Sequence, residues 1–200
     1  MGAWDDGPVQ PAIVFRAGAS RGYAVATWVV AAAVLAAFAV NGGAAEVLRY
    51  GALPLLLAAL GWTAFWRPLV RVERDGVRVV NVMSTTWLPW AAITGTRTRW
   101  GLELVTHDGK VGAWALPARS ALGRWTSAKR DVPVMTSLHR LDSVEAGGAD
   151  PAAVAGIVEE HKAGHLAAAA SAPRAERSLD VLPAALLMAT AGLALVSLLL

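Results

Sequence analysis

The sequence predicts an α+β membrane protein, in which a transmembrane helical hairpin, an antiparallel β-domain with a closing helix and a further transmembrane helix follow one another. Three observations predict this fold class. Hydrophobic residues make up 56% of the 200 residues, and charged residues only 16%, against about a quarter in soluble domains. Charge is almost absent from three stretches and ordinary between them. From Leu69 onward, apolar residues recur with a period of two, as in strands.

Two of the apolar stretches lie close together near the amino terminus. Residues 23–40 and residues 50–66 carry no charged side chain, and each is long enough, at about 17–20 residues, to cross a hydrocarbon core as a helix. The short linker 41–49 begins with the turn signal Asn-Gly-Gly, so we expect a helical hairpin over residues 23–66. A cleaved signal peptide is disfavoured for the first stretch, because its apolar core exceeds about 7–15 residues and a second span follows at once.

The third apolar stretch, residues 181–200, contains no charge at all. It is too long for the buried core helix of so small a protein, and we expect a third transmembrane helix. The given sequence ends on this stretch, which leaves a further span beyond Leu200 open.

Basic residues near the ends of the spans predict the orientation, because they are enriched in cytoplasmic segments. The linker of the hairpin carries only Arg49. We therefore expect a multi-pass protein of the cell membrane, with a cytoplasmic tail (residues 1–22) and a cytoplasmic middle domain. The basic residues on that side are Arg16, Arg21, Arg67, Arg71, Arg74, Arg78, Arg174 and Arg177.

The middle of the chain predicts a small antiparallel sheet or barrel. Asp75-Gly76 and Asp108-Gly109 each separate two alternating apolar runs, which is a strong hairpin signal. About six short strands are expected between residues 69 and 116, followed by a long loop with at most one further strand. Asp150-Pro151 then begins a helix to about residue 167, and residues 169–180 form a linker to the third span.

Several segments of the predicted sheet, taken in order, resemble a known family. Residues 74–81 read RDGVRVVN, residues 88–93 LPWAAI, residues 102–110 LELVTHDGK and residues 114–116 WAL. Together they resemble a bacterial pleckstrin-homology (PH) domain of the actinobacterial group named after low molecular weight protein antigen 6. A coding bias that gives 15 Arg and 3 Lys agrees with a bacterial and actinobacterial origin.

The resemblance implies a PH-like domain over residues 67–168, a bent antiparallel β-barrel with one open end plugged by the closing helix. The segment between Leu116 and Pro151 is longer than such a fold requires, and the third span lies outside the resemblance. Eukaryotic PH domains often bind inositol phosphates in a basic loop between their first two strands. Here that connection is the tight Asp75-Gly76 turn, which argues against phosphoinositide recognition.

No catalytic or metal-binding motif is found, and we expect no enzyme, no cofactor and no metal. The chain has no cysteine, which excludes thiol chemistry. His161 and His165 are four residues apart on the predicted closing helix, but Lys162 stands where a zinc protease motif needs Glu and no third ligand is evident. His107 and His139 lack the spaced partners that acid–base catalysis needs.

An excess of basic residues on the middle domain suggests contacts with a membrane surface or a partner. Solvated sheet faces, attraction to anionic lipid at about 1 kcal/mol per residue, and acidic partners are the alternatives. Nucleic acid is not expected, since aromatic residues are not interleaved with the basic ones. The candidate contact residues are Arg71, Arg74, Arg78, Arg97 and Arg99.

The sequence therefore predicts a membrane-anchored, non-catalytic PH-like module at the cytoplasmic membrane face, which binds a protein partner or organises a membrane assembly. The alternative is an accessory subunit of a transporter or secretion complex whose spans carry the function. Polar residues within the spans would favour that alternative, and only Thr27, Thr63, Thr190 and Ser197 occur there.

Overall fold

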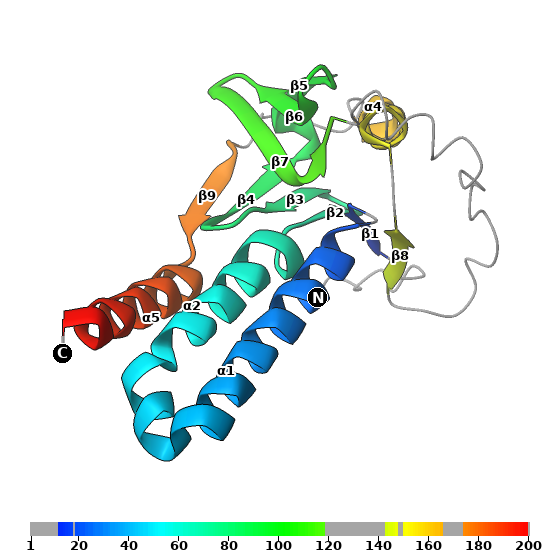
Figure 1. Ribbon diagram of the computed structural model, residues 1–200. Helices are drawn as coiled ribbons and strands as arrows, with labels where there is room; N and C mark the ends of the chain where they lie inside the picture. The colour runs from blue at the N-terminus through cyan, green and yellow to red at the C-terminus, as the bar shows by residue number, and fades with distance from the viewer. Residues whose placement is uncertain (1–11, 18, 119–142, 148–149, 166–173, 200) are drawn as a thin grey trace, which may run out of the picture.

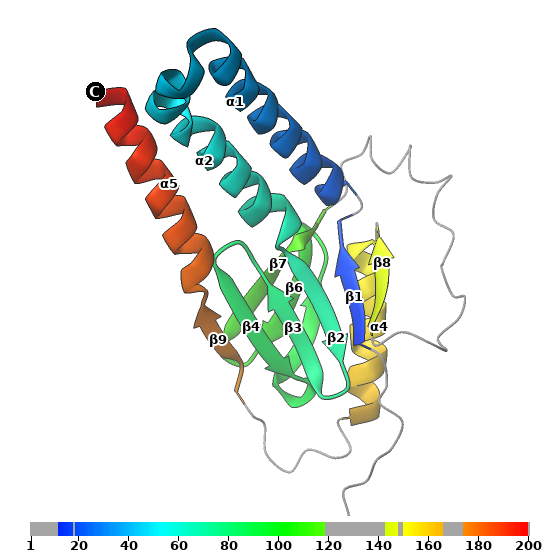
Figure 2. The ribbon, with the colours of Figure 1, turned by 90° about the horizontal axis from the view of Figure 1, so that it is seen from below.

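The computed structural model describes residues 12–17, 19–118, 143–147, 150–165 and 174–199. Three apolar helices lie side by side and extend from one end of a β-domain that is built from two sheets (Figure 1). The same arrangement is visible after a quarter turn, where the strands continue roughly along the direction of the helices (Figure 2). The molecule is thus an α+β protein with apolar helices towards both ends of the chain and antiparallel sheets in its middle.

The first two helices form the predicted hairpin. Helix α1 (Ser20–Tyr50) runs antiparallel to α2 (Ala52–Gly61), which continues as the π-helix η1 (Trp62–Trp66). Along their length Tyr23 contacts Phe65, with ring centroids 5.7 Å apart, and Trp28 contacts Trp66 at 5.2 Å. The third helix, α5 (Val181–Leu199), packs beside α2.

The linker of the hairpin differs from its prediction. Residues 41–49 were expected to form a loop, but the helical conformation continues to Tyr50 and is interrupted only at Gly43, where φ is 65° and ψ is −154°. Glycine adopts this backbone conformation without the steric cost of a Cβ. One residue therefore redirects the helix, and the turn signal in the sequence marks a helix break.

The helices differ in how well they fit a bilayer. Helices α1 and α5 are long and apolar enough to span one, whereas the apolar helix Ala52–Trp66 is shorter, at about 22 Å for a rise of 1.5 Å per residue. The predicted second span thus corresponds to a helix that lies between two longer ones (Figure 1).

Close packing of α1 against α2 depends on Gly61. A Cβ at this position would overlap the hydroxyl of Thr27 and lie 3.0 Å from the Thr27 Cβ. The indole of Trp28 donates a hydrogen bond to the carbonyl of Ala58, over 3.1 Å. The two helix backbones can approach so closely because no side chain separates them at Gly61.

The larger sheet has six strands in the order β8-β1-β2-β3-β4-β9. All neighbours are antiparallel except β1 and β8, which are parallel. Its strands are β1 (Ala12–Arg16), β2 (Leu69–Glu73), β3 (Gly76–Val80), β4 (Ser84–Pro89), β8 (Ser143–Gly147) and β9 (Glu176–Leu179).

The smaller sheet consists of β5 (Ile93–Arg97), β6 (Gly101–Thr106) and β7 (Gly109–Pro117). A single 3-10 turn, η2 (Trp90–Ala92), connects β4 to β5 at the corner between the sheets. Both predicted hairpins are present, with turns at Asp75 and Asp108.

Two expectations about the β-domain need correction. The barrel is not closed, because the chain changes sheet at η2 and the described residues form no hydrogen-bonded ladder between the two sheets. The sheet is also larger than predicted: β1 lies in the expected tail and β9 in the expected linker. β1 reads AIVFR, a continuous apolar run, and β9 reads ERSL, with one apolar residue, so neither shows the alternation that predicted β2 and β3. The predicted loop at residues 118–148 lies mostly outside the described residues, apart from β8.

The hydrophobic core lies between the two sheets, and the closing helix α4 (Pro151–His165) packs against it. Valines on alternate positions of β2 and β3 point inward and meet Leu102 and Leu104 of β6. Val154 and Val158 of α4 are fully buried in the same cluster. The helix therefore covers the apolar interior that two open sheets leave exposed, as the resemblance implied.

We predict that Gly61→Ala destabilises the helical hairpin by about 1–3 kcal/mol, the usual cost of forcing a methyl group into a packed site. The free energy of unfolding, measured by denaturant titration in detergent micelles, checks this. Gly192→Ala in α5 is the matched control, because a Cβ there meets open space. Equal effects of the two substitutions would contradict the close packing.

Candidate functional site

The β-domain holds the end of the second apolar helix through hydrogen bonds to its last carbonyls. Carbonyls in the final turn of a helix have no partner within the helix. The guanidinium of Arg16, in β1, donates to the carbonyl of Trp66 over 2.7 Å, and the indole of Trp114, in β7, donates to the carbonyl of Ala64 over 3.0 Å. Both sheets thus attach directly to the end of the helix.

A second attachment begins at Arg67, the first of the two residues between the helix and β2. Its guanidinium donates to the carbonyls of Asn81 and Val82, the latter over 2.9 Å, and forms an ion pair with Asp180. The Arg67 side chain is only 12% exposed. A cation so far removed from water requires these partners.

Asp180 immediately precedes α5 and is held from several directions. Its carboxylate accepts a hydrogen bond from the Thr85 hydroxyl over 2.9 Å, and its backbone N–H donates to the carbonyl of Met83 over 3.0 Å. A carboxylate at this position also interacts favourably with the positive end of the helix dipole. The ion pair therefore joins the end of the second apolar helix to the beginning of the third.

A groove lies where the helices meet the β-domain, and we call it the junction groove. Its volume is about 960 Å³. The carboxamide of Asn81 bridges one side of it, since it accepts from the N–H of Trp114 and donates to the carbonyl of Gly112, both over 2.8 Å. The lining residues are mostly apolar: Ala17, Ala19, Ser20, Tyr23, Ala64, Phe65, Pro68, Asn81, Val82, Met83, Ser84, Trp100, Gly101, Leu102, Glu103, Gly112, Ala113, Trp114, Ala115, Pro117 and Arg177.

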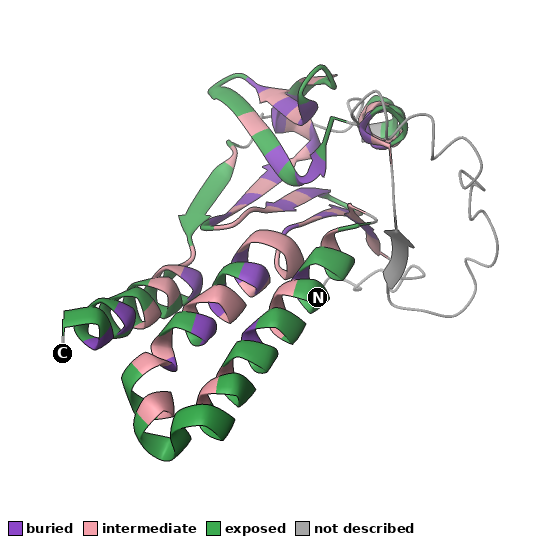
Figure 3. Cartoon of the chain, viewed as in Figure 1, coloured by how far each residue is buried: buried purple, intermediate pink, exposed green. Residues whose placement is uncertain are grey.

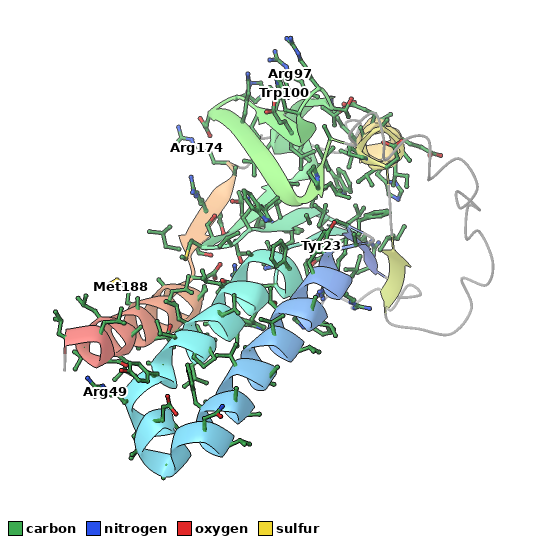
Figure 4. All side chains as sticks on the ribbon, viewed as in Figure 1. Tyr23, Arg49, Arg97, Trp100, Arg174 and Met188 are labelled. Carbon is green, nitrogen blue, oxygen red and sulfur yellow. The ribbon has the colours of Figure 1, made fainter. Side chains whose placement is uncertain are left out.

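Three aromatic side chains of the junction groove are strongly exposed. Trp100 is 75% exposed, Trp114 61% and Tyr23 58%; Figure 4 labels Tyr23 at the start of α1 and Trp100 on the smaller sheet. Large aromatic side chains at such exposure are unusual in water. Their place beside the ends of apolar helices is typical of the aromatic belt at a membrane surface.

The outer face of the six-stranded sheet carries two arginines side by side. Arg71 of β2 and Arg78 of β3 are directly opposite each other. Arg78 binds Glu73, with Nε 3.2 Å from the carboxylate oxygen, and stacks over the Trp87 ring at 5.2 Å. The Nε of Arg71 is buried and makes no hydrogen bond to the described residues. Like charges in such a pair repel each other, so an anionic group would stabilise this position.

The five arginines singled out from the sequence do not form one cluster. Arg71 and Arg78 share the outer face, whereas Arg74 lies in the β2–β3 turn, at the end of that hairpin away from the helices. Arg97 ends β5, and Arg99 lies over the ring of Trp100 at 5.3 Å, beside the junction groove. The structure thus separates an outer-face pair from Arg97 and Arg99 at the end of β5 in the smaller sheet.

The histidines that the structure describes do not form a catalytic or metal-binding group, and His139 lies outside the described residues. His161 stacks on Trp90, with ring centroids 5.7 Å apart, and its Nδ1 lies 2.8 Å from the carbonyl of Ile157. The side chain of His165 lies outside the described part of the structure. Among the described residues, no group of three histidine or acidic side chains is arranged to hold a metal ion.

The central strands and the corner turn between the sheets lie in a segment that matches one family model. Residues 67–142 match the model of the Bacterial PH domain. No curated protein and no solved structure matches the chain. The family match covers β2 to β7, so the resemblance to a bacterial PH domain is confirmed for the central strands. Such a domain is typically a non-catalytic module, and no catalytic family is matched.

Sequence analysis did not find the residues that attach this PH-like domain to the helices. Arg16 and Arg67 were noted only as orientation signals, and Asp180 and Asn81 were not singled out. Their partners are 50, 113 and about 30 residues away in the sequence. The one local signal that could have identified Asp180 is its position directly before an apolar helix, where an acidic residue is a favoured N-cap.

We predict that Asp180→Ala lowers the free energy of unfolding by about 1–3 kcal/mol, because Arg67 is left without its anionic partner in a largely buried position. Unfolding of the full chain in micelles measures the effect. Glu73→Ala is the matched control: its partner Arg78 is 44% exposed, and such pairs contribute at most about 1 kcal/mol. A smaller loss for Asp180→Ala than for Glu73→Ala would disprove the role of the ion pair.

Proposed function

We propose that this protein is a multi-pass membrane protein that holds a non-catalytic PH-like module at the cytoplasmic membrane face, where the module binds a protein partner. Membrane insertion is supported by the surface of the helices. Only 11% of the apolar window of α1 and 22% of that of α5 is buried, and Figure 3 shows both helices as mostly exposed. The core helix of a soluble protein would bury most of its apolar surface.

The position of β1 supports a retained first span. Removal of α1 as a signal peptide would also remove β1, which pairs with β2 and carries Arg16. The shorter apolar helix lies between α1 and α5 (Figure 1), so a bilayer that surrounds the outer two also holds the middle one. Three spans follow from this arrangement.

The orientation rests on basic residues at the two ends of the helices. The ends next to the β-domain carry Arg16, Arg21 and Arg67, whereas the opposite end carries Arg49 and the acidic Glu46. By the enrichment of basic residues in cytoplasmic segments, the β-domain is cytoplasmic. We take the PH-like module to extend to residue 168, with β1 and β9 added to its sheet, and to be of the antigen 6 type.

The proposal of a protein partner rests on the outer-face pair Arg71 and Arg78. Two arginines lie directly opposite each other beside the flat ring of Trp87, and the buried Nε of Arg71 has no hydrogen-bond partner among the described residues. An acidic side chain on a partner would bind both guanidinium groups through charge-assisted hydrogen bonds. We assign Arg97 and Arg99, beside the exposed Trp100, to contacts with the lipid surface.

The topology is tested with single cysteines, since the chain has none of its own. Ala45→Cys, at the far end of α1, should react with a membrane-impermeant maleimide on intact spheroplasts. Ala153→Cys, exposed on α4, should react only after lysis. The reverse pattern would place the β-domain outside, and labelling of both without lysis would argue against the spans.

The partner surface is tested by crosslinking the full chain in native membranes and comparing two double variants. Arg71→Gln with Arg78→Gln should lower recovery of the partner about tenfold, because one charge-assisted hydrogen bond contributes about 1.5–3 kcal/mol. Arg97→Gln with Arg99→Gln should leave the recovery unchanged. If neither pair has an effect and crosslinks map to the helices, the protein acts as an accessory subunit through its spans.

A further inference from the structure

The junction groove has the size and chemistry of a ligand site that neither the family match nor the outer-face pair explains. Its volume of about 960 Å³ falls within the roughly 300–1,000 Å³ usual for small-molecule sites. Its lining is apolar except at a few positions, among them Asn81, Glu103 and Arg177. Such a composition fits a long apolar ligand with a polar end.

We propose that the junction groove holds an acyl chain of a bilayer phospholipid, with the lipid phosphate at Arg177. This inference rests on the membrane insertion proposed above. The walls include Tyr23 of α1 and Phe65 at the end of the second helix, so the groove begins where these helices leave the hydrocarbon. A lipid enters it from the bilayer without exposing its chain to water, whereas a soluble apolar ligand has to cross the aqueous phase.

The placement of Arg177 suits a phosphate at the mouth of the junction groove. Arg177 of β9 is paired with Thr86 of β4, whose side chain is buried on the inner side of the sheet. Paired residues of neighbouring strands lie on the same face, so Arg177 points to the inner side, towards the groove that it lines. Glu103, on β6, also lines the groove, and the polar end of the site therefore carries one charge of each sign.

The exposed aromatic residues give an independent reason to place lipid here. Trp100 and Trp114 are 75% and 61% exposed, although both line the groove. The Trp114 indole N–H is already bonded to Ala64, which leaves its apolar ring surface outward. Amphipathic rings of this kind are stabilised at the level of lipid headgroups.

The experiment uses the full chain in vesicles of phosphatidylcholine and phosphatidylglycerol that contain a phospholipid with a photoreactive diazirine on its acyl chain. After illumination, crosslinked peptides are mapped by mass spectrometry. Crosslinks are expected on residues 100–103 and 112–117 of the β-domain as well as on the helices.

Two matched pairs of variants distinguish a lipid bound inside the groove from a lipid that only touches the surface of the protein. Gly112→Phe places a ring in the groove, because a Cβ there meets open space, and Gly95→Phe is the control at an equally open strand position. Gly112→Phe should lower the yield of β-domain crosslinks about tenfold, which is the loss of affinity expected when two methylene groups of the acyl chain are displaced from the groove. Arg177→Gln should lower them about fivefold, as expected for one arginine near anionic lipid, whereas Arg174→Gln, outside the groove, should not.

Each remaining outcome overturns a specific statement. Crosslinks confined to the helices would exclude lipid from the groove while leaving the membrane anchor intact. If the crosslinks on the β-domain persist in Gly112→Phe, the lipid touches only the outer surface of the domain and does not enter the groove. An absence of crosslinks anywhere, the helices included, would overturn the proposed membrane insertion itself.

Discussion

The ion pair between Arg67 and Asp180 constrains the rest of the structure, because it lies where three elements must meet. Two residues, Arg67 and Pro68, separate the second apolar helix from β2, and none separates Asp180 from α5. An arginine side chain that is only 12% exposed has to satisfy its donors within the protein, and here two carbonyls after β3 and the Asp180 carboxylate accept hydrogen bonds from it. The start of the third helix is therefore held beside the end of the second, because Arg67 requires the Asp180 carboxylate as a partner.

This constraint makes the β-domain part of the helical bundle and not an appendage on a flexible tether. β1 precedes the first helix and β9 leads into the third, so the six-stranded sheet is continuous with the chain on both sides of the apolar segments. Arg16 and Trp114 add hydrogen bonds from both sheets to the same helix end. Movement of the domain relative to the helices would break all of these contacts together.

The parts of the fold that sequence analysis predicted are those encoded locally. The Asp75-Gly76 and Asp108-Gly109 turns, the alternation in β2 and β3, and the Asp150-Pro151 start of α4 each depend on neighbouring residues. β1, β9 and the Arg67–Asp180 pair depend on segments 50 or more residues apart, which leave no periodic signal in one sequence. The arginines were identified by residue type, but the outer-face pair could be separated from the arginines of the smaller sheet only with the register of the strands.

The same register links the two proposed sites. β9 is only four residues long, and its successive residues point to opposite faces of the sheet. Arg177 lies on the inner face beside the junction groove, while Glu176 is paired with Trp87, in the outer row that contains Arg78. β9 continues through Asp180 into α5, so a lipid bound at Arg177 would contact a strand fixed to this apolar helix, and a partner bound at Arg71 and Arg78 would lie on the opposite face of the same sheet.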